Sequence, residues 1–403
     1  MGYEEPGRSG PLEPTPADEV DPSGADDPQG GEPGRDRFGV HMVWETILLL
    51  GFSALVYLLW RENPATLRGS GLRALILDVV GFGLLAMAAG LSLRTAAVNL
   101  AVGPVAVAAG LHFAEQGDRG LPVAVGTAAA VAALGGLVLG LVVVLLHVPG
   151  WAASLGGAAG VIVYVEQRSA PVLVQGDYDP RGIAGRLFVG LAAIAVIGGL
   201  FGAMSPIRRF TGRFRPVADP ARRRGVAAAV VVTGGYVCST VLAMLAGALF
   251  AASEGAMTPT AGLDWTVLAV GAALLAGTSA FGLRGGVFGT LLVAGALGLF
   301  FAYAQQRGWT VSRWAVGGVA LAAGLVVTRL VERYGRPVPG PTGWPAPPPA
   351  GDPASSGGWA LPRSAPVGDW PPVLPTQTTG GTADPWSTRR WETGARTWDT
   401  EER

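Results

Sequence analysis

The chain has 403 residues, half of them hydrophobic and only 14% charged, whereas soluble domains carry roughly 25% charged residues. The formal net charge is zero, which excludes a global field that would attract nucleic acid. All of its basic residues other than the three His are Arg, and since a P-loop needs Lys to reach the nucleotide phosphates, the chain is not expected to be an ATPase itself.

Polar composition divides the chain into three parts. Residues 1–40 are acidic and rich in Pro and Gly, so we expect a disordered tail there. Residues 41–334 are predicted to form the transmembrane domain. Residues 335–403 are rich in Pro, Gly and Thr with six spaced Trp, which predicts a second disordered tail. The fold class expected is therefore all-α, a polytopic membrane bundle between two tails.

Ten apolar runs occupy the middle part. A membrane helix needs about 20 apolar residues, and most of the runs have that length, which predicts about ten spans. The run Trp151–Val165 is short and interrupted by Gly, which is typical of a half-span or re-entrant segment. In chain order, the runs are Val43–Trp60, Leu72–Leu93, Thr95–Phe113, Leu121–Val148, Trp151–Val165, Ile183–Met204, Val226–Ala252, Leu263–Leu283, Val287–Tyr303 and Val311–Val331.

Glycines recur four residues apart within several runs. Such pairs allow two membrane helices to approach closely, although 62 Gly in one chain also produce pairs by chance. The pairs are Gly136/Gly140, Gly156/Gly160, Gly198/Gly202 and Gly285/Gly289.

Arginine placement predicts the orientation, because basic residues are retained in cytoplasmic loops. The stretch Ser205–Gly225 has seven Arg and one acid, and further Arg lie at Arg35–Arg37 and Arg329–Arg336. Ten crossings place all of these on one side, so both termini are predicted to be cytoplasmic in a multi-pass protein of the cell membrane. The connection Arg61–Gly71 is the one exception, since it holds Arg on the outer side.

Four stretches resemble the ribose-type (monosaccharide) ABC transporter permease family, within the group that also imports branched-chain amino acids and nucleosides. The resemblance covers roughly Asn63 to Val331, and the matches occur in family order. They are Asn63-Pro-Ala-Thr-Leu67, Asn99-Leu-Ala-Val-Gly103, Val148-Pro-Gly-Trp-Ala-Ala-Ser-Leu-Gly-Gly157 and Gly277-Thr-Ser-Ala-Phe-Gly-Leu-Arg-Gly-Gly-Val-Phe-Gly-Thr290.

The resemblance implies a transport subunit that imports a small polar solute, with a monosaccharide expected. Its implied partners are a cytoplasmic ABC ATPase, an extracytoplasmic solute-binding protein, a second permease copy and the lipid bilayer. Asn99 stands where the sugar importers have an acid, and Arg94–Asn99 resembles the nucleoside-importing branch, so a nucleoside permease remains an alternative. A non-transporting membrane scaffold that acts through its tails is the alternative of another class.

Four residues are candidates for the substrate path: Asn99, Asp78, Thr278 and Ser279. Polar groups within a membrane span face a cavity or another helix, so Asn99 either lines the path or joins two helices. Asp78 either contacts solute or is solvated near the membrane surface. The hydroxyls of Thr278 and Ser279 bind solute or bond the carbonyl four residues earlier in their own helix, and we favour the second reading.

The cytoplasmic segment Gly212–Gly225 resembles the family's ATPase-contacting segment in shortened form. The resemblance assigns coupling to Arg213, Asp219, Ala221, Arg222 and Gly225.

Catalysis and metal binding find no support in the sequence. His41, His112 and His147 are scattered without Cys or carboxylate at ligand spacing, and the lone Cys238 excludes an intramolecular disulfide. No nucleophile or zinc-protease motif occurs, so neither enzymatic activity nor a cofactor is expected.

Overall fold

The computed structural model describes residues 38–95, 97–204, 225–280 and 288–334. The chain divides into two units, Met1–Gly340 and Pro341–Arg403. The second unit lies outside the described residues, as do both predicted tails except for residues 38–40. Those three residues are helical, because the first helix already begins at Phe38.

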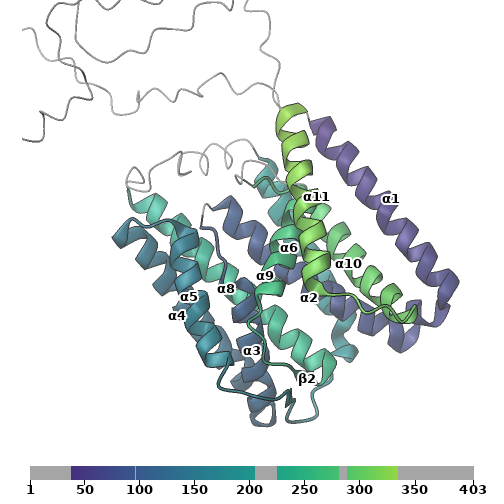
Figure 1. Ribbon diagram of the computed structural model, residues 1–403, viewed down its shortest axis with the longest axis horizontal. Helices are drawn as coiled ribbons and strands as arrows, with labels where there is room; N and C mark the ends of the chain where they lie inside the picture. Colours follow the sequence, from purple (N-terminus) through teal and green to yellow (C-terminus); the bar gives the residue numbers. More distant parts are fainter. Residues whose placement is uncertain (1–37, 96, 205–224, 281–287, 335–403) are drawn as a thin grey trace, which may run out of the picture. The chain divides into compact units, whose positions relative to one another are not determined.

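Each of the ten predicted runs contains an α-helix (Figure 1). Two residue pairs, Val172–Leu173 (β1) and Ala256–Met257 (β2), form a short antiparallel ladder. Single 3₁₀ turns precede or follow several helices: Pro64–Leu67 (η2), Gly117–Arg119 (η3) and Pro180–Ile183 (η4). The helices are α1 (Phe38–Glu62), α2 (Gly69–Arg94), α3 (Val102–Gln116), α4 (Leu121–Leu146), α5 (Gly150–Val165), α6 (Ala184–Ala203), α8 (Val226–Glu254), α9 (Leu263–Leu275), α10 (Gly289–Gln306) and α11 (Arg313–Tyr334).

Seven helices of the described residues are long and apolar enough to cross a membrane: α1, α2, α4, α6, α8, α10 and α11. The other three, α3, α5 and α9, have only 15, 16 and 13 residues. At a rise of about 1.5 Å per residue, even the longest of them is roughly 24 Å long, less than the hydrocarbon thickness of about 30 Å. The bundle is therefore a membrane-type helical fold, and the predicted count of about ten spans is not confirmed.

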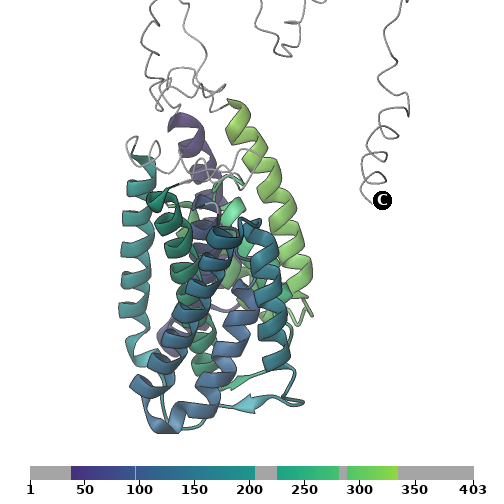
Figure 2. The ribbon, with the colours of Figure 1, turned by 90° about the vertical axis from the view of Figure 1, so that its left-hand side faces the viewer.

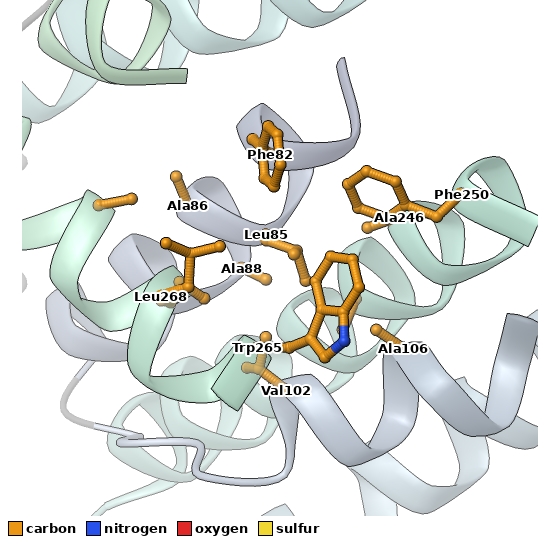
Figure 3. Close-up of a cluster of buried hydrophobic side chains, with 14 of the residues drawn as sticks. Phe82, Leu85, Ala86, Ala88, Val102, Ala106, Ala246, Phe250, Trp265 and Leu268 are labelled. Atoms are coloured by element: carbon orange, nitrogen blue, oxygen red, sulfur yellow. The ribbon is translucent and has the colours of Figure 1, made fainter. Parts of the chain in front are cut away.

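The core forms where α2, α3, α8 and α9 meet (Figure 3). Phe82 of α2, Phe250 of α8 and Trp265 of α9 make successive ring contacts, with centroids 5.3 and 4.7 Å apart. Alanines fill the spaces between the helices, and Ala88, Ala106 and Ala246 are almost completely buried. Small side chains permit close helix approach where lipid supplies no hydrophobic drive.

The peripheral helix α4 has one face packed against the bundle and one exposed apolar face. Small residues at four-residue spacing, including Ala128, Ala132, Gly136 and Gly140, are buried along one face of α4, and the last three lie against α8. The opposite face exposes large apolar side chains: Val131, Leu134, Val138, Leu141 and Leu145. An exposed aliphatic face of this kind suits contact with lipid rather than with water.

The start of α1 and the end of α11 lie toward the same end of the bundle in both views (Figure 2). The end of α6 and the start of α8 lie there too, on either side of the Arg-rich residues 205–224, which are themselves outside the described residues. The β1–β2 ladder lies toward the opposite end. This arrangement agrees with an even number of crossings between the two ends of the helical domain.

Candidate functional site

The chain loses its helical conformation between α2 and α3, inside the bundle. Residues 97–101 are not part of any helix. They are buried or half-buried, and Ala97 and Ala101 are at most 1% exposed. We call this segment the first break. Its backbone groups need partners in place of water, because unpaired polar groups are costly away from solvent.

Asn99 lies at the centre of the first break with only 1% of its surface exposed. Its Nδ2 donates to Ser239 Oγ of α8 at 3.1 Å, and that hydroxyl donates to Ala88 O of α2 at 2.9 Å. Its Oδ1 accepts from Ala101 N, two residues further along the chain, at 3.0 Å. The amide therefore links the first break to α8 and, through Ser239, to α2.

Hydroxyls from three helices bond further backbone groups in and beside the first break. Ser154 Oγ of α5 accepts from Leu100 N and lies 3.0 Å from Val98 O. Tyr236 Oη of α8 bonds Val98 O at 3.0 Å and Gly150 O at 2.6 Å. Thr266 Oγ1 of α9 accepts from Gly103 N and lies 3.1 Å from Leu100 O.

A second break follows α9, where residues 276–280 are not helical and α10 begins only at Gly289. The two ends of this break stay close, because a Cβ at Gly289 would collide with Ala276 O. Thr278 and Ser279 are 3% and 2% exposed and lie in this non-helical segment. Within the run predicted over Leu263–Leu283, the helix ends at Leu275 and residues 276–280 are not helical, so Thr278 and Ser279 lie outside a helix.

Two adjacent residues of α1 bond the two ends of the second break. Trp44 Nε1 donates to Leu275 O at 2.8 Å. Glu45, which is 7% exposed, accepts from Phe288 N at 2.9 Å and Gly289 N at 3.3 Å through one oxygen, Oε1.

Helix α2 passes between the two breaks. Ala88 O accepts the hydrogen bond from Ser239 beside the first break. Gly90 faces the second break, since a Cβ there would lie 3.6 Å from Thr278 Oγ1. Thr278 therefore lies beside Gly90 of α2, and Asn99 is linked through Ser239 to Ala88, two residues earlier in the same helix.

Asp78 is not part of this cluster. It lies on α2 ten residues before Ala88, a distance of about 15 Å along the helix, and is only partly buried. The nearby Gly81 packs against Phe250 of α8. Asp78 therefore lies apart from Asn99 and Thr278.

Of the residues assigned to coupling, Arg213, Asp219, Ala221 and Arg222 lie outside the described residues. Gly225 is described, and it precedes α8 with a φ of 111°. That backbone angle favours glycine, so Gly225 has a local role at the start of the helix.

The sequence did not single out Glu45, Ser154, Tyr236, Ser239 or Thr266. The signal for Glu45 was present, because it is an acid inside the first apolar run, and such acids are functional candidates. No comparable signal marked the hydroxyl residues, since Ser and Thr are common in membrane helices and their role depends on which helix lies opposite. Among the described residues, no group of three or more His, Cys, Asp or Glu is arranged to hold a metal.

Comparison of the chain with protein-family models, with curated proteins and with solved structures finds no match.

Proposed function

We propose that this chain is the membrane-spanning permease subunit of an ABC importer for a small polar solute, with a monosaccharide as the expected cargo. In this proposal separate cytoplasmic ATPases drive the cycle, a solute-binding protein delivers the cargo, and a second permease copy completes the path. The four motif resemblances suggest the family, and the absence of Lys fits a subunit that depends on a partner for ATP hydrolysis.

The observation that carries the proposal is the pair of helix breaks on either side of α2. Transporters commonly place their solute paths at discontinuous helices, because unwound backbone at membrane depth is tolerated only where protein or a cavity satisfies it. Here the breaks bring Asn99 and Thr278 to the stretch Ala88–Gly90. A bundle that serves only as an anchor has no need of two such interruptions.

The structure also gives a reason to keep the scaffold as a second candidate. The hydrogen bonds around the first break are made within the protein, including both ends of the Asn99 amide. A break bonded in this way holds helices together as effectively as it lines a path. The nucleoside alternative receives no comparable support, since the residue that suggested it, Asn99, is bonded internally.

The test is solute uptake in a strain that lacks the gene. The strain is complemented with the wild-type chain or with an empty vector, and uptake of radiolabelled pentoses, hexoses and nucleosides is measured. We expect the empty-vector strain to lose uptake of one monosaccharide. Loss of nucleoside uptake alone would favour the nucleoside permease, and unchanged uptake of every solute would favour the scaffold.

A matched pair of variants then tests the site. Thr278→Val keeps the side-chain volume at the second break but removes the hydroxyl, and we expect reduced uptake at normal membrane abundance. Gly156→Ala alters an open position on α5, with no atom within 4 Å of an added Cβ, and should transport normally. Purification of the tagged chain from native membranes should also recover a P-loop ATPase, whereas its absence would count against the coupling part of the proposal.

A further inference from the structure

Helix α1 has one packed face and one exposed face. The packed face lies against α2 and α10, where Leu59 is fully buried in a cluster with Leu75 and Leu299. On the other face, at about 3.6 residues per turn, six exposed residues line up in a stripe along the helix. The stripe changes from aliphatic to aromatic to cationic toward the C-terminal end of α1. Its members are Val43, Ile47, Leu50, Ala54, Tyr57 and Arg61.

The order of side chains along this stripe matches the order of chemical groups in one leaflet of a bilayer. Leu50 is aliphatic and 65% exposed, which suits contact with acyl chains. Tyr57 and its neighbour Trp60 are 55% and 53% exposed, and such rings concentrate at the membrane–water interface. From Leu50 to Arg61 the helix rises about 16 Å, close to half of the hydrocarbon thickness of roughly 30 Å. If Leu50 lies near the bilayer centre, Arg61 lies at the level of the lipid headgroups.

The connection between α10 and α11 supports this level for the membrane surface. It lies beside the C-terminal end of α1 (Figure 1), where Asn63 Nδ2 donates to Gln306 Oε1 at 3.1 Å. Trp309 in this connection is 52% exposed, and its ring contacts that of Tyr303 with centroids 5.7 Å apart. The ends of α1 and α10 therefore present aromatic rings to the same interface.

Arg61 and Arg68 add positive charge at this level. Both are exposed, and within the described part of the chain neither side chain has a hydrogen bond or an ion pair. Glu62, the acid next to Arg61, pairs instead with Arg307 at 3.1 Å. In the predicted orientation these two Arg are the exception to the retention of basic residues in cytoplasmic loops. An anion at the membrane surface supplies the counter-charge that the described residues do not.

We propose that the exposed face of α1 binds an anionic phospholipid, with the phosphate against Arg61 and Arg68 and the acyl chains along the aliphatic part of the stripe. A guanidinium group donates paired hydrogen bonds to phosphate oxygens. A zwitterionic phospholipid offers the same chains and phosphate, but its headgroup cation cancels the charge, so it is bound less tightly. This site is separate from the proposed solute path, and it stands whether or not the chain transports a solute.

Lipid binding to the purified full-length chain tests the proposal. Phosphatidylglycerol or phosphatidylcholine with the same acyl chains is added to the protein in a neutral detergent, and the midpoint of thermal unfolding is followed. A ligand that binds only the folded protein raises this midpoint, which gives an apparent affinity. We expect phosphatidylglycerol to bind more tightly than phosphatidylcholine. Inorganic phosphate alone, added as a second probe, should give no comparable rise.

Substitutions then locate the site. Arg61→Gln should weaken phosphatidylglycerol binding about fivefold, the factor that corresponds to about 1 kcal/mol for one Arg at an anionic membrane surface. Arg68→Gln should weaken it in the same way, and neither should change phosphatidylcholine binding. Arg61→Lys keeps the charge but loses the planar fork, so it should weaken binding less than Arg61→Gln. The matched control is Arg119→Gln, which removes an exposed Arg from η3, beside α3 and α4, and should leave both affinities unchanged.

Each of the following results would overturn the proposal. Equal affinity of the wild-type chain for the two lipids would remove the preference for an anionic headgroup. Unchanged phosphatidylglycerol binding in both Arg61→Gln and Arg68→Gln, or an equal loss in Arg119→Gln, would mean that this face of α1 does not hold the lipid. A midpoint rise with inorganic phosphate equal to that with phosphatidylglycerol would indicate a phosphate site. All the substituted side chains are exposed, and the midpoint without lipid verifies that each variant is folded.

Discussion

Buried hydroxyl groups in the bundle fall into two classes according to whether they have a partner. Thr240 of α8 bonds Ala132 O of α4 and Tyr236 O of its own helix, both at 2.9 Å. Thr328 of α11 is also buried, at 6% exposed, but its Oγ1 has no hydrogen-bond partner among the residues that the structure describes. A buried hydroxyl without a partner costs free energy, whereas a bonded one stabilises the fold.

This contrast predicts opposite effects for the same substitution. Thr240→Val should lower the free energy of unfolding by about 1 kcal/mol, because it removes a bond between α8 and α4. Thr328→Val should leave it unchanged or raise it by up to about 1 kcal/mol, since it removes only an unpaired group. The midpoints of thermal unfolding in detergent measure both, and a larger loss for Thr328→Val than for Thr240→Val would contradict the structure.

Glu115 and Arg168 form the least exposed of the described ion pairs. The Arg168 Nη2 atom lies 2.9 Å from Glu115 Oε2, and the guanidinium also stacks over the Tyr164 ring. The hydrogen bond from Arg168 lowers the pKa of Glu115 below its ordinary value of 4.5. Glu115 lies near the end of α3, outside the seven candidate spans.

The lowered pKa predicts a pH-dependent contribution to stability. A carboxyl with a depressed pKa stabilises the folded state above its unfolded pKa, and this stabilisation is lost as the pH falls through the folded pKa. The difference in unfolding midpoint between wild type and Glu115→Gln should therefore be largest near neutral pH, shrink as the pH falls below the ordinary value of 4.5, and disappear below the lowered pKa of Glu115. Glu62→Gln, which removes a more exposed pair with Arg307, should show a smaller difference. A difference for Glu115→Gln that does not change with pH would exclude this account.

At the scale of elements, glycine pairs of the same spacing have different surroundings. A Cβ at Gly136 of α4 would lie 2.7 Å from Val237 Cα and 2.8 Å from Tyr236 O of α8. Gly156 and Gly160 of α5 have no atom within 4 Å of an added Cβ. The spacing alone therefore identified one true helix contact and one pair on an open face.

The two pairs predict different responses to alanine. Gly136→Ala should destabilise the protein by roughly 1–3 kcal/mol, because α4 and α8 have to move apart to admit the methyl group. Gly156→Ala should be neutral, or stabilising by up to about 1 kcal/mol, since alanine favours helix more than glycine does. Thermal unfolding of the two variants compares them directly, and equal midpoints would argue against the packing of α4 on α8.

At the scale of the whole molecule, the helical domain has to cross the membrane an even number of times if both of its ends face the same side. The start of α1 and the end of α11 lie toward one end of the bundle, and the exposed Ser312, which precedes α11, lies at the opposite end of that helix. The cluster of Arg in residues 205–224 indicates that the first of these sides is the cytoplasm.

Single cysteines test this orientation in the Cys238→Ser background. A cysteine at Ser312 should react with an impermeant thiol reagent in intact cells, whereas a cysteine at Ser355 in the C-terminal tail should react only after the membrane is permeabilised. The reverse pattern would invert the orientation. Labelling of both positions in intact cells would mean that the number of crossings between them is even, contrary to the single crossing by α11.

The sequence by itself determined the membrane-type class and the approximate position of each described helix, because long apolar runs have no other stable fold in lipid. It also located the start of the helical domain to within a few residues. Where α3 begins and where α9 ends was decided only by the tertiary structure. The runs Thr95–Phe113 and Leu263–Leu283 are mostly apolar, and isolated polar residues such as Asn99 and Thr278 do not by themselves mark where a helix is interrupted.

Those breaks are stable only because partners distant in the sequence replace the lost helical hydrogen bonds. Ser239 is 140 residues from Asn99, and Glu45 is 243 residues from Phe288. Pairings of that range cannot be read from local pattern, since they depend on which helices pack side by side. The residues at the proposed path were therefore partly predictable, as Asn99 and Thr278 were, while the side chains that hold them in place became evident only from the packed bundle.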